Sequence, residues 1–220
     1  MPGIKPKGKV KIKWSRNFAY GIGLIVSDGC LSKNGRHISF TSKDKDLALF
    51  FKEVFGLDSK LGKKSRADKG EKKYYVVQFG DVIFYKFLVS IGIMSNKSKI
   101  IKGIKVPKKY FFEFLRGLFD GEGHSYSYWD KRWKSSFMLY TGFSSASKEF
   151  IKWLRARIGE RLGIYGSIDG SSPKGYWILR YAKNDSLKII KKMYPKNTKI
   201  FLPRKRLKLI KALSIMGEKI

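Results

Sequence analysis

The sequence predicts an α+β protein made of two pseudo-symmetric repeats, each with the element order helix, strand, strand, helix, strand, strand, helix. An apolar helical pattern that ends in an acidic residue and a glycine occurs twice, and the same succession of patterns follows each copy. Hydrophobic residues also make up 43% of the 220 residues, which is enough to bury a substantial core. These observations predict a folded protein rather than a disordered basic tail.

The two repeated helices define the start of each repeat. An apolar helical stretch runs over residues 18–27 and is followed by Asp28 and a glycine. A second stretch runs over residues 110–121 and is followed by Glu122 and a glycine, 94 positions after Asp28. Gly23 and Gly117 occupy equivalent positions inside these helices, where a glycine costs about 1 kcal/mol relative to alanine. Because both helices contain a glycine at this position despite its cost in helix stability, we expect that the two helix backbones approach each other closely there.

The patterns that follow each helix predict the remaining elements. In the first repeat they are strands within residues 30–43, a helix at 44–56, strands within 61–79 and a helix at 81–92. In the second they are strands within 124–143, a helix at 147–163, strands within 164–182 and helices at 186–194 and 203–216. We therefore expect an N-terminal half at 1–93, a Lys-rich linker at 94–106 and a C-terminal half at 107–220 that ends in the basic helix.

The charge of the chain indicates a polyanionic partner. Forty-eight Lys and Arg residues against 17 Asp and Glu residues give a net charge of +31, spread along the whole length. Such a field attracts nucleic acid. No apolar run is long enough for a membrane span, and the N-terminal residues lack the apolar core of a secretory signal. With Cys30 as the single cysteine, these features predict an intracellular protein, cytoplasmic, nucleoid-associated or organellar, and not a secreted one.

The strand patterns predict one buried face and one polar, basic face. Ile38 and Phe40 alternate with Ser39 and Thr41, which would lie on the opposite side of the sheet. A solvated face is the ordinary explanation, but the charge and the doubling of the pattern favour a nucleic-acid-reading surface. The candidate contact residues are Lys33, Arg36, Ser39, Thr41, Lys43, Lys64, Arg66, Lys73, Gln78, Tyr126, Tyr128, Lys131, Arg132, Lys134, Tyr140, Lys174, Tyr176 and Arg180.

The nonapeptides GIGLIVSDG at 21–29 and LRGLFDGEG at 115–123 resemble the LAGLIDADG motif of homing endonucleases. The two-copy layout is similar to the monomeric members of that family, and the resemblance covers nearly the whole chain. It implies that the motif helices pack side by side at the centre of the molecule. It also implies that two antiparallel sheets form a saddle along the major groove, on either side of a central minor groove of a double-stranded DNA target.

The resemblance also implies the activity. One phosphodiester would be hydrolysed on each DNA strand across the minor groove with Mg²⁺, for which Mn²⁺ would substitute, leaving 3′ overhangs and using no small-molecule substrate. The metal ligands would be Asp28, Glu122 and the backbone carbonyls of Ser27 and Gly121. Two carboxylates held together repel each other, so they need a proton or a shared cation, and hard oxygen ligands suit Mg²⁺. The chain length favours an intron-encoded or independent gene over an intein.

Basic residues of the active-site pocket are carried over from the same resemblance. Family members have a lysine before the helix that closes each half, and the matching stretches here give Lys97 and Lys205, with Lys99 and Arg204 as neighbouring alternatives. A second pocket position is occupied by Ser42 and Lys43 in the first half and by Ser144 and Ser145 in the second. Asp120 matches an acidic motif position, but its counterpart is Val26, so we expect solvation or capping at the helix end rather than metal binding.

Two other functions are open on the sequence. The first is a non-cleaving DNA- or RNA-binding protein of the same fold, such as an intron maturase or a regulator. The second is a basic structural RNA-binding protein, for which loose tails and no doubled core would be expected. The acidic residues retained at both motif ends favour the nuclease.

Overall fold

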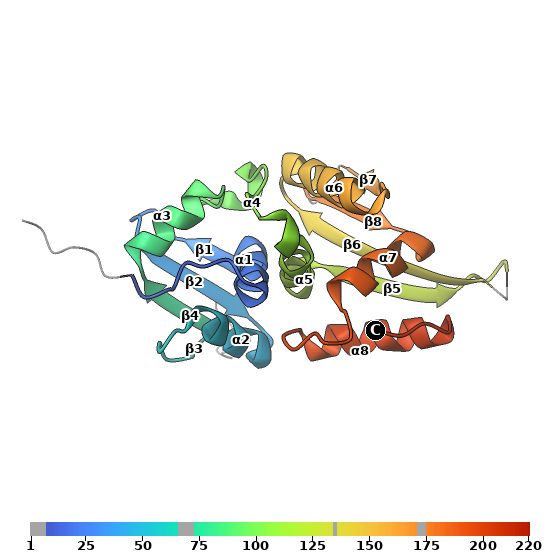
Figure 1. The fold of residues 1–220 in the computed structure, drawn as a ribbon, viewed down its shortest axis with the longest axis horizontal. Helices are drawn as coiled ribbons and strands as arrows, with labels where there is room; N and C mark the ends of the chain where they lie inside the picture. The colour runs from blue at the N-terminus through green and yellow to red at the C-terminus, as the bar shows by residue number, and fades with distance from the viewer. Residues whose placement is uncertain (1–7, 66–72, 134–135, 171–174) are drawn as a thin grey trace, which may run out of the picture. The chain divides into compact units, whose positions relative to one another are not determined.

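The computed structural model describes residues 8–65, 73–133, 136–170 and 175–220 (Figure 1). The first half contains α1 (Arg16–Asp28), β1 (Gly29–Leu31), β2 (His37–Ser42), α2 (Lys45–Phe55), β3 (Gly62–Lys64), β4 (Tyr74–Gly80) and α3 (Val82–Ser90). The short α4 (Lys97–Ile100) and the 3-10 helix η1 (Lys108–Tyr110) follow. The second half contains α5 (Phe111–Glu122), β5 (His124–Trp129), β6 (Phe137–Ser145), α6 (Lys148–Leu162), β7 (Ser167–Asp169), β8 (Trp177–Tyr181), α7 (Lys183–Met193) and α8 (Pro203–Ile215).

The expected fold class is confirmed, because each half has the element order αββαββα. Each half also forms its own four-stranded antiparallel sheet, with the orders β1-β2-β4-β3 and β5-β6-β8-β7. Each strand of the first sheet has an equivalent strand at the same place in the second sheet, as the sequence repeat predicts. A segment in the region expected to link the halves is helical, since α4 lies between residues 94 and 106.

Contacts between residues divide the chain into two compact units. The first unit extends to Lys97 and also contains Ile104–Gly121, and the second contains Ser98–Gly103 and Glu122–Ile220. The helix α5 therefore belongs, up to Gly121, to the same unit as α1.

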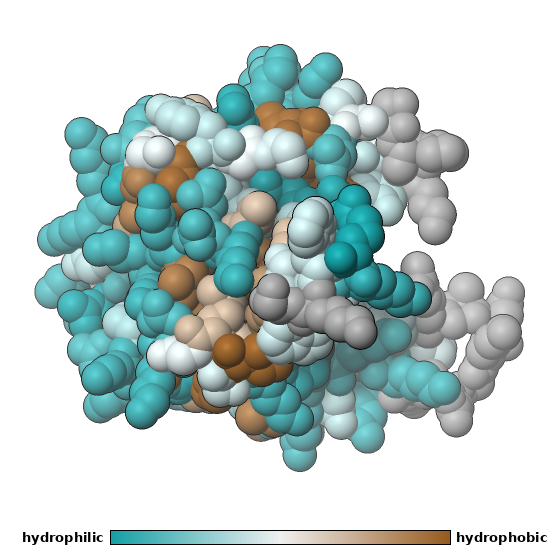
Figure 2. Space-filling view, turned by 90° about the vertical axis from the view of Figure 1, so that its right-hand side faces the viewer, coloured by the Kyte–Doolittle hydropathy of each residue, from teal (hydrophilic) through white to brown (hydrophobic). Residues whose placement is uncertain are grey.

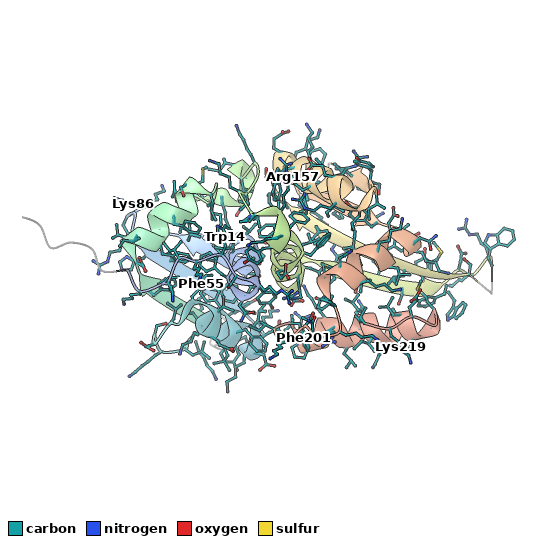
Figure 3. All side chains as sticks on the ribbon, viewed as in Figure 1. Trp14, Phe55, Lys86, Arg157, Phe201 and Lys219 are labelled. Atoms are coloured by element: carbon teal, nitrogen blue, oxygen red, sulfur yellow. The ribbon has the colours of Figure 1, made fainter. Side chains whose placement is uncertain are left out.

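Aromatic side chains form much of the core of the first unit. The ring of Phe18 in α1 contacts Trp14 at a ring-centre distance of 5.4 Å and Phe55 of α2 at 5.6 Å. Trp14 and Phe55 are labelled in Figure 3. Phe40 of β2 stacks on Phe51 of α2 at 4.5 Å. Edge-to-face and offset ring contacts of this kind add to the stabilisation from apolar burial. They hold α1 and α2 against one face of the first sheet.

The second sheet is covered on one face by α6 and α7. Leu139 and Leu179 are fully buried beneath these helices, as are Leu154 and Ile189 from the helices themselves. A buried polar link joins α7 to the sheet, because the Ser186 hydroxyl accepts the Thr141 backbone N–H at 2.9 Å. Both sheets thus keep one face for the core, and within the described part of each unit no helix covers the other face.

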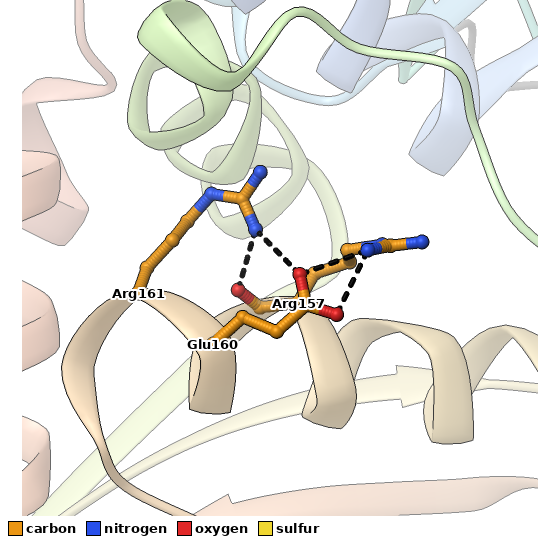
Figure 4. A network of polar contacts seen from close by, with 3 residues as sticks. All are labelled: Arg157, Glu160 and Arg161. Carbon is orange, nitrogen blue, oxygen red and sulfur yellow. Dashed lines mark hydrogen bonds and ion pairs between the residues drawn. The ribbon is translucent and has the colours of Figure 1, made fainter.

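The outer side of α6 carries a charged network. Glu160 accepts hydrogen bonds at 2.8 Å from Arg157 and lies 3.5 Å from the Arg161 guanidinium (Figure 4). Exposed ion pairs contribute at most about 1 kcal/mol, so the pair of Arg157 and Glu160 has little effect on stability. The face of the molecule seen in Figure 2 is mainly hydrophilic, with hydrophobic residues gathered in small patches. Across the described residues, none of the helices has the length and apolarity needed to span a membrane.

Two glycines let the backbones of α1 and α5 come into direct contact. The Cα atoms of Gly23 and Gly117 are so close that a Cβ built on Gly117 would lie 3.2 Å from the Cα of Gly23 and would collide with the Tyr20 carbonyl oxygen. A Cβ on Gly23 would lie 2.6 Å from the Leu118 backbone nitrogen. Backbone atoms cannot move aside as a flexible side chain can, so the expected close approach of the two helices is present and requires glycine on both sides.

Replacing Gly117 with alanine should destabilise the first unit. The clash with the Tyr20 carbonyl involves backbone atoms, so we expect a cost near the upper end of the usual range of about 1 to 3 kcal/mol for overpacking. This cost exceeds the gain of about 1 kcal/mol in helix propensity, so the free energy of unfolding should fall. Urea unfolding of the parent and the variant measures this. Gly62→Ala is the matched control, because its Cβ would meet nothing closer than 3.5 Å. Equal stability of the Gly117 variant and the control variant would contradict the backbone contact.

Candidate active site and nucleic-acid interface

The motif acids lie at the last positions of α1 and α5. Asp28 is half-buried and ends α1, where the N–H of Gly29 closes the helix by donating to the Ile25 carbonyl. Glu122 ends α5 and is exposed. A Cβ at Gly121 would lie 2.6 Å from the Asp28 Oδ2 atom and would collide with Ser27. The backbone of α5 next to Glu122 is therefore packed directly against the end of α1, with Asp28 beside it.

The two lysines expected in the pocket make equivalent contacts in the two halves. The Lys97 ammonium donates to the carbonyl oxygen of Gly29 at 2.6 Å, and the Lys205 ammonium donates to the carbonyl oxygen of Gly123 at 2.6 Å. Each acceptor is the residue directly after a motif acid. Lys97 is only 8% exposed, and a buried ammonium needs oxygen partners of this kind. The neighbouring alternatives, Lys99 and Arg204, are both exposed.

The expectation for Asp120 was wrong. The side chain is 1% exposed, so it is buried rather than solvated at the helix end. Its carboxylate accepts a hydrogen bond from the Tyr20 hydroxyl of α1 at 2.9 Å, and the buried Arg116 guanidinium lies 5.3 Å from the centre of the Tyr20 ring. Burial, together with the nearby Asp120 carboxylate, raises the pKa of Tyr20 well above its usual value. Asp120 thus joins α1 to α5 through a buried polar contact.

The second pocket position has different surroundings in the two halves. The Ser42 hydroxyl accepts the Asp44 N–H at 3.0 Å, and the Ser145 hydroxyl accepts the Ser147 N–H at 3.1 Å, so both serines order the entry to a helix. Lys43 extends over the Tyr74 ring at 5.5 Å. Only the first half therefore has a cation at this position among these residues.

The uncovered face of the first sheet carries several of the expected contact residues. Ser39 and Gln78 face each other across β2 and β4, Thr41 follows two positions along β2, and Lys64 pairs with Tyr74 at the sheet edge. The register places these side chains on the side opposite to buried Ile38, Phe40, Val77 and Phe79. Exposed basic residues extend this face through the turns, namely Lys33, Arg36 and Lys73.

The uncovered face of the second sheet is aromatic as well as basic. Tyr126 lies opposite Tyr140, Tyr128 follows along β5, and Arg180 lies on the same side of β8. The Arg180 guanidinium is paired with Asp169 at 2.9 Å. Tyr176, Lys131 and Arg132 adjoin this face, and an ion pair of 2.9 Å joins Arg132 to Asp130. The hydrogen bonds from Arg132 lower the pKa of Asp130 to about 2.

Three of the expected contact residues lie outside the described residues, namely Arg66, Lys134 and Lys174.

Two residues that the sequence did not indicate, His124 and Lys208, lie beside the end of the second motif. Lys208 donates to the Ser125 carbonyl, and burial together with Lys205, Arg180 and Lys208 lowers the pKa of His124. Lys208 follows Lys205 by three positions in α8, so helical periodicity was the signal that could have found it.

The groups around the end of α1 include oxygen donors that suit a divalent metal ion. Among the described residues there is no cluster of three or more His, Cys, Asp or Glu side chains. Around the end of α1 the available donors are the Asp28 carboxylate and backbone carbonyl oxygens, which are hard ligands. Such a donor set fits Mg²⁺, which typically binds through one or two carboxylates and completes its coordination with water and phosphate oxygens.

Each half thus contains one helix that ends in an acidic residue and one four-stranded sheet. The two helices pack through glycines, which defines a two-repeat protein with one motif helix in each repeat. The family profile described as LAGLIDADG-like domain matches residues 17–92 and 110–194. The chain therefore belongs to the LAGLIDADG family, with one motif in each half.

Solved structures show the same fold. The I-LtrWI LAGLIDADG homing endonuclease bound to target DNA has a TM-score of 0.60 and 13% identity, with coverage of 92% of this chain and 90% of that chain. A mesophilic variant of the homing endonuclease I-DmoI has a TM-score of 0.56 and 17% identity, with coverage of 87% and 97%. Full-length DUF199/WhiA from Thermatoga maritima has a TM-score of 0.54 and 15% identity, with coverage of 94% and 70%. A search of curated proteins gave no significant match.

Removing the Tyr20 hydroxyl should expose the role of Asp120. Tyr20→Phe leaves a buried carboxylate without its hydroxyl donor, so the free energy of unfolding should fall by about 1 to 3 kcal/mol. Tyr165→Phe is the control, because Tyr165 is 59% exposed. Chemical unfolding of both variants provides the measurement. A Tyr20 variant as stable as the control variant would show that the contact contributes nothing to stability.

Proposed function

We propose that the chain is a site-specific double-strand DNA endonuclease of the homing type. It would hydrolyse one phosphodiester on each strand across the minor groove and leave 3′ overhangs, acting as a monomer with a divalent metal. The observation that carries the proposal is the repeated arrangement of motif acid, glycine carbonyl and lysine ammonium in the two halves. A duplication of catalytic groups suits an enzyme that must cut two strands.

The binding part of the proposal rests on charge and on the two open sheet faces. A net charge of +31 favours contacts with many phosphates, and the polar side chains on the uncovered faces suit base edges in the major groove. I-LtrWI and I-DmoI have both been solved in complex with DNA. We propose that the two sheets together form the saddle over one double-stranded target, with lysines of the turns, such as Lys33 and Lys73, contacting phosphates.

We assign metal binding to Asp28, Glu122 and the backbone carbonyls of Ser27 and Gly121. The fit rests on their hard oxygen donors, and the I-DmoI complexes with DNA include one with Ca and one with Mn. When bound, Mg²⁺ or Mn²⁺ would supply an activated water and stabilise charge on the phosphate and on the leaving oxygen. Asp28 and Glu122 would orient and neutralise this cation, since neither carboxylate has to move far from a helix end.

Lys97 and Lys205 would support the charge that develops on the scissile phosphates. An ammonium fixed by a backbone carbonyl is already oriented before the substrate arrives, and preorganised donors of this kind are among the largest contributions to catalysis. Each lysine would serve the half to which its glycine carbonyl belongs. Because only the first half has Lys43 at the second pocket position, the two strands would be cut at unequal rates.

Replacing the motif acids should separate binding from cleavage. Asp28→Asn and Glu122→Gln remove the negative charges that hold the cation, so cleavage should fall by at least about 100-fold while duplex binding persists. A target is first selected from a random duplex library by binding to the parent protein. Cleavage of a supercoiled plasmid carrying this target, with and without Mg²⁺, together with an electrophoretic binding assay, checks the prediction. Undiminished cutting by both variants would remove the active-site assignment. Binding without any cutting by the parent would favour a non-cleaving regulator or maturase.

Replacing each pocket lysine should slow cleavage with little effect on affinity. Lys97→Met and Lys205→Met keep the side-chain length but remove the charge, so the cleavage rate should fall by about 100-fold. The exposed Lys99→Met is the matched control within α4, and Lys211→Met is the control within α8. Single-turnover rates on nicked intermediates would assign each lysine to one strand. Equal rates for test and control variants would contradict a catalytic role for these ammonium groups.

A further inference from the structure

Three tyrosines form a stacked cluster on the open face of the second sheet. The ring centres of Tyr126 and Tyr140 are 4.9 Å apart with planes 14° from parallel, and Tyr128 stacks beside both at 6.4 and 6.3 Å. Two rings lying flat and side by side on the sheet would meet at their edges, so their centres could not come as close as 4.9 Å. They therefore stand on the sheet with their faces turned toward each other, and their edges and hydroxyl groups point away from it.

The cluster is accessible and its hydroxyls can donate. Tyr126 is 36% exposed and Tyr128 is 46% exposed, although both lie on strand β5 within a regular antiparallel register. Loss of hydration raises the pKa of Tyr140, with a smaller contribution from its hydrogen bond to Tyr128. The Tyr140 phenol consequently stays protonated at neutral pH.

The first half has no such cluster at the equivalent positions. Cys30 and His124 each follow the glycine of a motif, so Ser32 is the counterpart of Tyr126. The Ser32 N–H donates to the His37 carbonyl at 2.9 Å, which makes His37 the counterpart of Tyr140. A serine and a histidine on one sheet therefore replace two tyrosines on the other. The two sheets present different chemistry to whatever lies against them.

Among the four bases, thymine matches the tyrosine cluster best. In the major groove thymine presents a hydrogen-bond acceptor, O4, beside an apolar C5-methyl group. A standing tyrosine offers a hydroxyl donor at the end of an apolar ring edge. Guanine offers acceptors without a methyl group and suits arginine, but the Nη2 atom of Arg180 on this face is already paired with Asp169. Adenine and cytosine present amino donors and no methyl group.

We propose that Tyr126, Tyr128 and Tyr140 determine specificity for thymine in the half of the target that contacts the second sheet. This inference rests on the proposed DNA binding and adds the chemistry that one half-site must have. Stacking of unpaired bases is a different possibility for exposed aromatic residues on a sheet. The rings here already use their faces against one another, which favours duplex recognition by edges and hydroxyls.

The test begins with selection of duplexes from a random library by the full chain without divalent metal. A parallel selection with Tyr126→Ala should lose its base preference at one or two positions, which identifies the base pairs that the cluster contacts. Thymine should be enriched there by the parent. Both variants used below alter exposed side chains, and thermal unfolding verifies that they fold.

Deoxyuridine then replaces thymine at those positions and removes only the methyl group. Affinity of the parent should fall about three- to fivefold for each methyl, the effect expected for loss of one buried apolar carbon. Tyr126→Ala should bind the thymine and uracil duplexes equally, whereas Tyr126→Phe should keep the uracil effect. Deoxyuridine in the other half-site is the matched control and should change affinity by less.

Each alternative outcome has a distinct meaning. An equal uracil effect in parent and Tyr126→Ala, or no thymine preference at the identified positions, would overturn the inference. Tighter binding of single-stranded than of duplex DNA would overturn it in favour of base stacking. Cleavage of the selected duplex with Mg²⁺ but without a uracil effect would contradict the inference alone. A uracil effect without cleavage would instead contradict only the proposed nuclease activity.

Discussion

The structure depends on the direct backbone contact between α1 and α5. Gly23 and Gly117 have no side chain at the crossing, so the carbonyl of Tyr20 and the backbone of Leu118 fill the space that any Cβ would need. The contact fixes how far along each other the two helices lie. The same register brings Gly121 against Ser27 and Asp28 at the end of α1. A displacement of one helix by a single residue would replace glycine by a larger residue at both places.

Polar groups reinforce this apolar and backbone contact. Tyr20 and Asp120 form a buried hydrogen bond, and Arg116 lies against the same tyrosine ring. An unpaired polar group in such a place would be costly, so the hydrogen bond favours one arrangement of the helices over neighbouring ones. Closer to the motif ends, the lysine contacts tie α4 to Gly29 at the start of β1, and α8 to Gly123 between α5 and β5. These contacts fix the backbone just beyond each acidic residue.

Much of this organisation was predictable from local patterns. The paired motifs, the element order and the glycine crossing follow from periodicity, because helices, strands and turns have different local signatures. The resemblance to the family also indicated Lys97 and Lys205 as pocket residues, and their catalytic role stays a prediction. The role of Asp120 could not be found in this way, since its partner Tyr20 is 100 positions distant and belongs to the other repeat. The pairing of Arg180 with Asp169, and the stacking of three tyrosines, likewise depend on strand register, which local patterns leave undetermined.

The difference between the pairs Ser32–His37 and Tyr126–Tyr140 has a consequence for how the protein can change. In a homodimer every substitution appears twice, so both copies of a surface must alter together. Here each sheet is encoded by its own stretch of one polypeptide, while the glycine crossing is shared. Substitutions can therefore accumulate on one sheet without altering the other, and an asymmetric ligand can be matched one side at a time.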